Sequence, residues 1–414
     1  MSSRLSAASP QSRRSGPAIW LAGMLLLSVW GPGVAADRAA GINLSQVCPP
    51  GFELEDQGCR LRSLYQRYDS LQGAGVGGLK TGLPPWRDGF TPQQIDLGRY
   101  LFFDPLLSAD HTLSCASCHQ PERGFADGMG RSVGSGGQLS ARSAPSLWNV
   151  AFLQRLFWDA RADSLEQQML EPLFSAAEMA NSPAALRASL RDSAAYRALF
   201  AQAFPDHFSH PGAAIELDQL YTALVAFQTS LISLNSRYDQ YAHGHGGALS
   251  ASEKAGLNVF RSFVARCAEC HTPPLFSNQQ LAVIGTPEPE GLPFDPGAGP
   301  GLGEPSLRGA FRTPGLRNIA LTAPYMHSGR FATLREAVAF YTGGRGHAVP
   351  ASEDLRIHWH IWEPRLTDEE LDQLVEFLHT LTDESLKPVT PAAVPSGLPL
   401  MHGPTTPITT GSTP

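Results

Sequence analysis

The sequence lacks an apolar run long enough to cross a membrane. Near the N-terminus, AIWLAGMLLLSVW (Ala18–Trp30) supplies thirteen mainly apolar residues, whereas a transmembrane helix needs about twenty. Three arginines precede this run, and the small residues Val34–Ala36 follow it, which is the pattern of an export signal peptide. We therefore expect residues 1–36 to be removed on export, with an uncleaved tether as the alternative, and the mature chain to lie in the periplasm without a stable membrane span.

The chain has too few basic residues to bind a nucleic acid or an anionic membrane surface. It carries 31 lysines and arginines against 38 aspartates and glutamates, and removal of residues 1–36 leaves 28 basic residues against the same 38. The resulting net charge of −10 opposes binding to phosphate groups. The roughly 380 residues that remain, in a chain that is 42% hydrophobic, are enough for two domains with separate cores.

Alternation of apolar and polar residues, which would indicate half-buried strands, is nowhere sustained. Helix-start patterns recur instead, with an N-cap residue followed by an acidic or amide side chain. The clearest lie at Phe90–Ile95, Ser250–Glu253 and Leu366–Leu371. The helix that begins after Ser250 should carry Leu257, Phe260 and Val264 on one face. We predict an all-α fold with few or no strands and with long loops rich in glycine and proline.

Cysteine is scarce, and the six copies fall into two groups. Cys48 and Cys59 lie close together in CPPGFELEDQGC, where an exported chain would form a disulfide, with free thiols as the alternative. The other four form two C-x-x-C-H motifs: Cys115, Cys118 and His119 in CASCH, and Cys267, Cys270 and His271 in CAECH.

The C-x-x-C-H motif is the attachment sequence of haem c. Its two thiols add to the haem vinyl groups and its histidine binds the iron from the proximal side, so His119 and His271 are the expected proximal ligands. A redox C-x-x-C or half of a zinc site would not explain why a histidine follows both copies. We therefore predict two covalently bound haem c groups, one in each of two domains.

The two motifs also divide the chain. We expect a signal peptide over residues 1–36, an N-terminal extension with the disulfide over 37–88, a first haem domain over 89–245 and a second over 246–386. Residues 387–414 are mostly proline, threonine, serine and glycine, and this composition predicts a disordered tail.

The first haem should have an open distal face. After His119 the next histidine is His207, so the segment that follows the first motif offers no histidine as a sixth ligand. Met129 and Met169 are the local alternatives, and the loop Ser132–Gly137 has no strong neutral ligand. An iron with an open face can bind peroxide, whereas one with protein ligands on both faces transfers electrons.

Several segments resemble the bacterial dihaem cytochrome c peroxidase and MauG family, from about Gly89 to Thr382. LGRYLFFDPLLS precedes CASCH, and RSAPSLWNVAF and LFWDARADSLEQQMLEPLFSAAEM follow it; TPGLRNIALTAPYMHSG and TLREAVAFY follow CAECH. The resemblance implies two cytochrome c-like haem domains, of which the first reacts with hydrogen peroxide. It also implies that Trp158 conducts electrons between the haems, and that Glu178 and Gln168 assist peroxide cleavage on the first haem.

Two departures from the peroxidases resemble MauG. Ser135 occupies the position where a histidine blocks the first haem in peroxidases that need reductive activation, and Tyr341 occupies the position of the methionine on the second haem. The resemblance therefore implies that Tyr341 is a ligand of the second haem iron. Met326, in PYMHSG, is the rival ligand. A tyrosinate ligand lowers the haem potential and favours higher oxidation states, whereas methionine does the opposite.

The resemblance also implies a calcium ion between the haem domains. Its carbonyl ligands match Thr322 and Pro324, but the asparagine that should supply a side-chain ligand is replaced by Ser143. A serine hydroxyl is a poorer calcium ligand than an amide oxygen.

Within the family, CPPGF…GC and GGLKTGLPPWRDGFTPQQIDLG are most similar to the MauG-type enzyme MbnH, which oxidises a tryptophan of its partner MbnP. The leading hypothesis is a periplasmic oxidase that uses peroxide to form a high-valent dihaem state. This state then oxidises a side chain of an MbnP-like partner, and tryptophan is the leading candidate. The alternative is a peroxidase that takes electrons from a small redox protein. A third hypothesis is a dihaem electron carrier.

Overall fold

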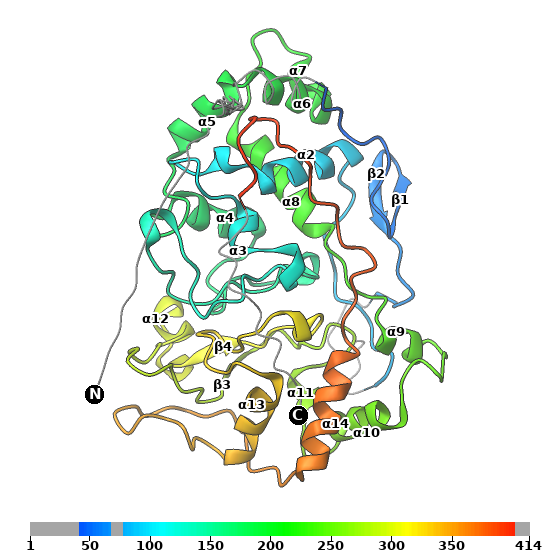
Figure 1. The fold of residues 1–414 in the computed structure, drawn as a ribbon, viewed down its shortest axis with the longest axis vertical. Coiled ribbons are helices and arrows are strands. Elements are labelled where there is room, and N and C mark those ends of the chain that lie inside the picture. Colours follow the sequence, from blue (N-terminus) through cyan, green and yellow to red (C-terminus); the bar gives the residue numbers. More distant parts are fainter. Residues whose placement is uncertain (1–40, 68–77, 402–414) are drawn as a thin grey trace, which may run out of the picture.

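The computed structural model describes residues 41–67 and 78–401 as a mostly helical chain (Figure 1). Within these ranges the strands are four and short, which confirms the predicted all-α class. No helix in the same ranges is long and apolar enough to cross a membrane. The predicted signal peptide, residues 1–36, lies outside the described residues.

The first domain packs around helices α2 and α8. Its helices are α2 (Pro92–Phe103), α3 (Cys115–Cys118), α4 (Leu165–Phe174), α5 (Pro183–Asp192), α6 (Ala194–Ala203), α7 (Pro205–Phe208) and α8 (Leu217–Thr229). Thr91 begins α2 with a capping box to Gln94, as predicted. A Cβ atom on Gly98 of α2 would lie 1.8 Å from the carbonyl oxygen of Ala223 in α8, so this glycine permits the close approach of the two helices.

The second domain repeats this arrangement with α10 and α14. Its helices are α9 (Arg237–Ala242), α10 (Ala251–Arg261), α11 (Cys267–Cys270), α12 (Ala298–Leu302), α13 (Leu334–Ala339) and α14 (Asp368–His379). Ser250 and Thr367 form the predicted capping boxes. A Cβ on Gly256 of α10 would lie 1.9 Å from the carbonyl oxygen of Gln373 in α14. Helix α10 ends at Arg261, so the prediction that Val264 shares its apolar face is wrong.

The strands form two antiparallel pairs, of which the first is a hairpin. β1 (Phe52–Glu55) pairs with β2 (Gly58–Leu61) in the N-terminal extension, and β3 (Leu281–Val283) pairs with β4 (Ala310–Arg312) in the second domain. The disulfide between Cys48 and Cys59 is present, as predicted. Cys59 is buried in one cluster with Ile95 of α2 and Ala226 of α8, so the first hairpin is anchored on the first domain.

The domain boundary lies earlier than residue 245. Tyr238 and Ala242 of α9 belong to the second core, where the Tyr238 ring contacts the rings of Phe276 and Phe377. Before α9, the last buried residue of the first core is Leu231, which follows α8. The predicted boundary between residues 245 and 246 is therefore wrong, because α9 packs on the domain that follows it.

The prediction of a disordered tail is wrong over residues 387–401. This segment runs from the end of α14 back along the first domain (Figure 1). Val394 is completely buried in the first core, and the Ser396 hydroxyl donates a hydrogen bond of 2.6 Å to Asp104. The composition of this proline-rich segment gives no indication of these two contacts. Residues 402–414 lie outside the described part of the chain.

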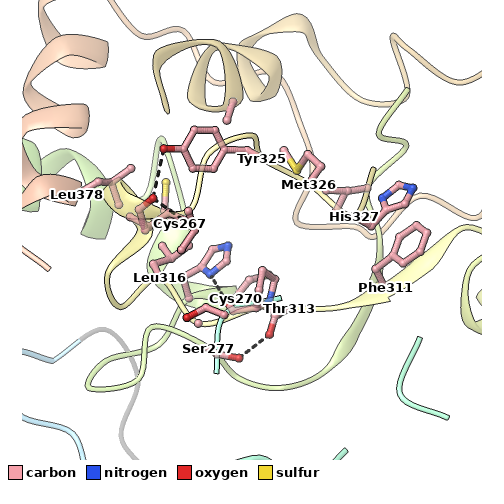
Figure 2. A pocket seen from close by; sticks show the side chains of 18 of the residues that line it. Cys267, Cys270, Ser277, Phe311, Thr313, Leu316, Tyr325, Met326, His327 and Leu378 are labelled. Carbon is pink, nitrogen blue, oxygen red and sulfur yellow. Dashed lines mark hydrogen bonds between the residues drawn. The ribbon is translucent and has the colours of Figure 1, made fainter. Parts of the chain in front are cut away.

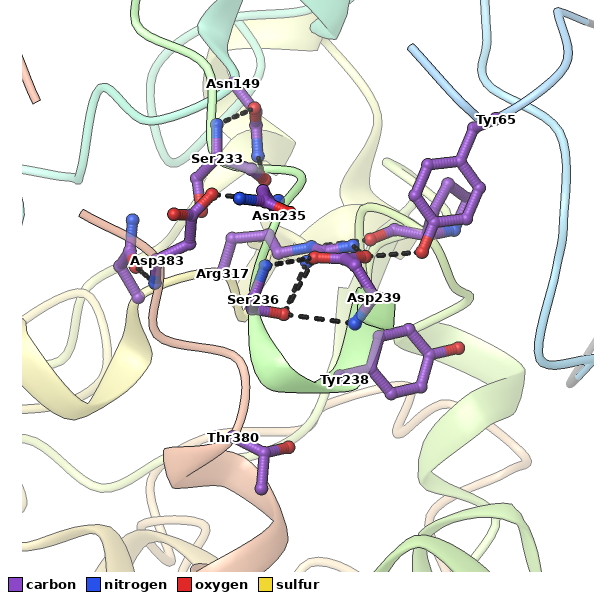
Figure 3. A network of polar contacts seen from close by, with 12 residues as sticks. Tyr65, Asn149, Ser233, Asn235, Ser236, Tyr238, Asp239, Arg317, Thr380 and Asp383 are labelled. Carbon is purple, nitrogen blue, oxygen red and sulfur yellow. Dashed lines mark hydrogen bonds and ion pairs between the residues drawn. The ribbon is translucent and has the colours of Figure 1, made fainter. Parts of the chain in front are cut away.

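A buried polar network joins the N-terminal extension to the second domain (Figure 3). The Arg317 guanidinium binds the Asp239 carboxylate with an Nη2–Oδ1 distance of 2.7 Å, and both side chains are almost inaccessible to solvent. The hydroxyls of Tyr65 and Ser236 donate to the same carboxylate. Burial by itself would raise the pKa of Asp239, but the Arg317 charge and these hydrogen bonds hold it below the usual value.

Replacing Arg317 with methionine is expected to destabilise the fold by about 3–5 kcal/mol, because Asp239 would remain buried without its cation. A depressed pKa means that the pair stabilises the fold above the ordinary pKa of aspartate and that this stability is lost as pH falls through the folded pKa. Thermal unfolding of the holoprotein between pH 3 and 7 measures both effects. The matched change in the exposed Arg335–Asp368 pair, Arg335→Met, should leave the melting temperature nearly unchanged. Equal losses in the two variants would contradict the assignment.

Candidate functional site

The predicted site residues of the second domain surround a cavity of about 300 Å³. Cys267, Cys270 and His271 line it, together with Tyr341 and Met326. Figure 2 shows the part of this cavity around Cys267, Cys270, Tyr325 and Met326. The cavity extends to residues of the first domain, and its lining is mainly apolar side chains. An apolar enclosure with a few converging polar groups is typical of a cofactor site.

The second C-x-x-C-H motif is shaped to present one imidazole nitrogen. Cys267–Cys270 form the single helical turn α11, and His271 follows directly as its C-cap. His271 Nδ1 lies 3.0 Å from the carbonyl oxygen of Phe276 and 3.1 Å from that of Pro314, so it carries the proton and donates it. Nε2 is then free, and burial lowers the pKa of His271 and keeps the ring neutral. A neutral, oriented imidazole is what iron ligation requires.

The first motif repeats this geometry in α3. His119 Nδ1 donates to the carbonyl oxygen of Phe125 at 2.9 Å, and burial lowers the pKa of His119. Cys115 and Cys118 are free thiols, and burial raises the pKa of each to about 12. Both motifs therefore offer two unpaired thiols beside one free imidazole nitrogen, which fits covalent haem c.

Arg312, which sequence reasoning missed, supports this fit. The side chain lines the cavity, is buried and forms no ion pair with a carboxylate in the described part of the chain. Its side chain donates a hydrogen bond of 3.4 Å to the carbonyl oxygen of Phe157, and burial lowers the pKa of Arg312 to about 10. A buried cation of this kind needs an anion. A haem propionate would supply this anion. No sequence pattern around Arg312 indicates that the folded protein leaves it without a carboxylate partner.

Tyr341 lies at the end of the helix that the sequence places it on. Helix α13 starts at the Thr333 capping box and continues as a tight turn, Phe340–Gly343, which directs Tyr341 to the cavity. Burial raises the pKa of Tyr341, and the neighbouring Cys267 and Cys270 raise it further. Met326 lines the same cavity in a left-handed backbone conformation (φ 72°). Both candidate iron ligands are therefore present, and the choice of Tyr341 stays a prediction.

Trp158 is held by both domains. The indole Nε1–H donates to the carbonyl oxygen of Ser143 at 2.9 Å, and the Trp158 carbonyl accepts from the backbone N–H of Arg312 in β4 at 2.7 Å. Its side chain lines the cavity. Because the acceptor of Nε1–H is a backbone carbonyl, no base contacts this proton. This position suits an electron relay between the domains, and the relay role of Trp158 stays a prediction.

The structure brings two distant predicted residues of the first domain together. The backbone N–H of Ser135 donates to the carbonyl oxygen of Glu178 at 2.8 Å, and Gly134 packs so tightly on Ala177 that a Cβ there would lie 1.8 Å from its carbonyl oxygen. Burial raises the pKa of Glu178, and the Glu178 charge in turn raises that of Cys118. Glu178 therefore lies within electrostatic reach of the first haem attachment motif.

The other first-domain candidates take separate places. Gln168 is partly buried on α4, and within the described ranges no hydrogen bond involves its side chain. Met169 is buried in the first core, and Met129 lines the cavity between the domains. None of these positions tests the role expected for Gln168, which stays a prediction.

The residues predicted to bind calcium do not fit that ion. The Ser143 hydroxyl lies 3.2 Å from the carbonyl oxygens of both Met326 and His327, so it acts as a hydrogen-bond donor instead of offering a free ligand oxygen. In the described ranges no cluster of three or more histidine, cysteine or acidic side chains could hold a metal ion. Thr322 and Pro324 line the cavity.

Sequence reasoning also missed a buried pair beside Ser143. His327 Nε2 lies 2.9 Å from a Glu288 oxygen, and the His327 ring stacks on Phe311 with 3.8 Å between ring centroids. The backbone carbonyl of His327 accepts from the N–H of Ser143 at 2.8 Å, and the carbonyl oxygen of Ser143 accepts in turn from the indole N–H of Trp158. The only signal in the sequence was the position of His327 directly after Met326.

Comparison with known proteins shows consistent likenesses. The family model for di-haem cytochrome c peroxidase (CCP_MauG) matches residues 92–247. The cytochrome c551 peroxidase of Pseudomonas aeruginosa is 33% identical over 308 residues, covering 73% of this chain and 83% of the relative. The methylamine utilization protein MauG of Methylorubrum extorquens is 33% identical over 300 residues, covering 72% and 81%.

Solved structures give the same picture. A MauG-like protein associated with microbial copper homeostasis is 36% identical, with a TM-score of 0.67, and the match covers 74% of this chain and 95% of that one. The diheme peroxidase BthA of Burkholderia thailandensis is 28% identical, with a TM-score of 0.64, and the match covers 88% and 99%.

Proposed function

The chain belongs to the dihaem cytochrome c peroxidase and MauG family of haem-dependent oxidoreductases that act with peroxide, and from this premise we propose that it is a periplasmic, MauG-like oxidase of a partner protein. It uses hydrogen peroxide to remove two electrons from a side chain of that partner, tryptophan being the first candidate. The alternative is a peroxidase supplied with electrons by a small redox protein.

One observation favours the oxidase. Tyr341 lies in the wall of the cavity that Cys267, Cys270 and His271 border, close enough to the two thiols for their charges to affect its pKa. A phenolate oxygen is anionic and hard, so it stabilises oxidised iron, whereas a methionine sulfur stabilises reduced iron. A site built to hold an oxidising equivalent suits the oxidation of a partner better than it suits accepting electrons from a donor.

The first site supports peroxide chemistry without prior reduction. Ser135, where a blocking histidine would stand, has a short side chain and is tied through its backbone to Glu178. Bound haem would supply an iron that binds peroxide and exchanges single electrons. Glu178 would take a proton from one peroxide oxygen and return it to the other, which leaves as water. Gln168 would orient the bound peroxide by a hydrogen bond.

The remaining residues connect the two sites. Trp158, fixed to Ser143 and Arg312, would conduct electrons across the domain contact. Arg312 would hold a haem propionate. His119 and His271 would hold the two irons, each through Nε2. An MbnP-like exported protein is the expected partner.

Spectra of the fully oxidised holoprotein test this proposal against its alternatives. We expect one high-spin and one low-spin haem by electron paramagnetic resonance, and a fast reaction with equimolar peroxide without prior reduction. Activity that appears only after one-electron reduction would support the donor-dependent peroxidase instead. Two low-spin haems that do not react with peroxide would indicate an electron carrier.

A further inference from the structure

Aromatic side chains gather on the surface where the wall of the cavity meets solvent. In the described part of the chain the two exposed tryptophans are Trp359 and Trp362, at 66% and 38% exposure, in the loop between α13 and α14. Phe263, 74% exposed, follows α10 and lies beside Trp362, with 6.4 Å between ring centroids. Single exposed apolar residues are ordinary, but a group of large ones marks a contact surface.

Trp362 is held in a defined orientation. Its Nε1–H donates to the carbonyl oxygen of Val264 at 3.0 Å. The Arg266 guanidinium lies 4.4 Å from the Trp362 ring centroid and 4.1 Å from that of Phe263, which gives a cation–π contact on each ring. Arg266 directly precedes Cys267 in the chain. The aromatic patch, defined as Phe263, Arg266 and Trp362, is therefore part of the segment that carries the second haem attachment motif.

Trp362 is part of the cavity wall and is also exposed at the surface. It lines the same cavity as Cys267 and Tyr341, and it is also accessible from solvent. Trp359 is more exposed and belongs to the same loop, but it does not line the cavity; it contacts His360, with 3.5 Å between ring centroids. An indole ring that reaches from the surface to a redox site gives an electron a short path through a single side chain.

The charged member of the aromatic patch is Arg266. Arg266 forms no ion pair in the described part of the chain, and in the segment that carries Trp362, residues 356–365, the sequence has two arginines, Arg356 and Arg365, and one acidic residue, Glu363. The chain as a whole has 31 basic and 38 acidic residues. A cation that lies between two exposed aromatic rings favours an acidic protein segment as the bound partner.

We propose that Trp362 is the relay residue through which electrons enter from the partner, and that the aromatic patch binds an acidic segment of the partner that carries the oxidisable aromatic side chain. This rests on the proposed function. For a tryptophan that gains one oxygen atom from water, two electrons and two protons leave the partner. The two electrons pass through Trp362 one at a time, and with two protons they reduce one peroxide to two water molecules.

Two synthetic peptides test the relay with the holoenzyme: an acidic peptide with a single tryptophan, and its lysine-rich counterpart. With peroxide and the acidic peptide, Trp362→Phe is expected to slow peptide oxidation at least tenfold, measured by mass spectrometry. Peroxide consumption in the first turnover should stay within twofold of wild type. Trp359→Phe, the matched control from the same loop, should oxidise the peptide within twofold of wild type. Wild-type rates in Trp362→Phe, or equal losses in both variants, would overturn the relay.

Binding without turnover tests the patch separately. An acidic peptide in which phenylalanine replaces the tryptophan should bind wild type by calorimetry at low salt and weaken on addition of salt. Arg266→Gln should weaken it about tenfold at low salt, and the lysine-rich peptide should bind more weakly than the acidic one. Equal affinity of the two peptides would overturn the acidic partner.

Peroxide treatment without any peptide separates the relay from the proposed function. If wild type oxidises no peptide but Trp362 itself gains oxygen, the relay stands and the oxidation of a partner protein falls. If wild type and Trp362→Phe oxidise the peptide at the same rate, the oxidation of a partner protein stands and the relay falls. If neither the peptide nor Trp362 is oxidised, both fall.

Discussion

Replacing Tyr341 with methionine is expected to raise the reduction potential of the second haem by about 0.2 V, out of the roughly 0.8 V over which axial ligands set haem potentials. The oxidised state that persists after peroxide addition to wild type should disappear, because a thioether stabilises reduced iron and a phenolate stabilises oxidised iron. The position permits the test, since Tyr341 lies in the cavity wall with Cys267 and Cys270. Spectroelectrochemistry measures the potential, and stopped-flow spectroscopy measures the lifetime.

Two further variants identify the ligand. Tyr341→Phe removes the phenolate with little change in shape and should also abolish the persistent oxidised state. Met326→Leu, at the rival position in the same cavity, should leave both potential and lifetime unchanged. If Met326→Leu alters the second haem and Tyr341→Phe does not, methionine is the ligand. The chain would then be closer in chemistry to the donor-dependent peroxidases.

Replacing Glu178 with glutamine is expected to slow the reaction with peroxide by about 10²–10⁴-fold, which is the usual contribution of a positioned general acid–base. An amide keeps the size of the side chain but cannot accept the proton. The Ser135 bond to the backbone of Glu178 does not involve the side chain, so the loop should keep its conformation. The second haem spectrum should be unchanged in this variant. A rate within threefold of wild type would exclude Glu178 from proton transfer.

The pH dependence of the same reaction adds a signed test. Burial, followed by the charge of Glu171, raises the pKa of Glu178, while Arg161 lowers it. Glu178 accepts a proton only when it is ionised, so the rate should rise with pH through this raised pKa. Glu171→Gln removes the repulsion and releases Arg161 from its 2.8 Å pair with Glu171, and both changes lower the pKa of Glu178. The rise should therefore move to lower pH, and a shift to higher pH would contradict this account.

Features that depend on a few neighbouring residues could be predicted well. The three capping boxes at Thr91, Ser250 and Thr367 begin helices where expected. Each depends on side chains three positions apart. The Cys48–Cys59 disulfide is also local, because its two cysteines are separated by only 11 positions. Both C-x-x-C-H motifs form single helical turns because their ligands are adjacent in sequence.

Features that depend on contacts between distant segments could not be predicted. The composition of residues 387–401 predicts disorder, yet Val394 fills a position in the first core that only the folded domain creates. Helix α9 precedes the predicted boundary but packs on residues of α14, more than a hundred positions later. Local patterns carry no information on which surface a segment will meet.

The sequence by itself determined that the chain carries two C-x-x-C-H motifs, and from them it predicts where two haems attach and which histidines bind them; it also predicts that Ser135 and Tyr341 stand at the positions that separate oxidase from peroxidase. These are matters of residue identity at fixed spacing. Only the tertiary structure decided that Ser135 meets Glu178, that Arg312 is a buried cation without a carboxylate, and that Trp362 joins the cavity to the surface. Burial and proximity set pKa values, charge balance and electron paths, and both arise only when the chain has folded.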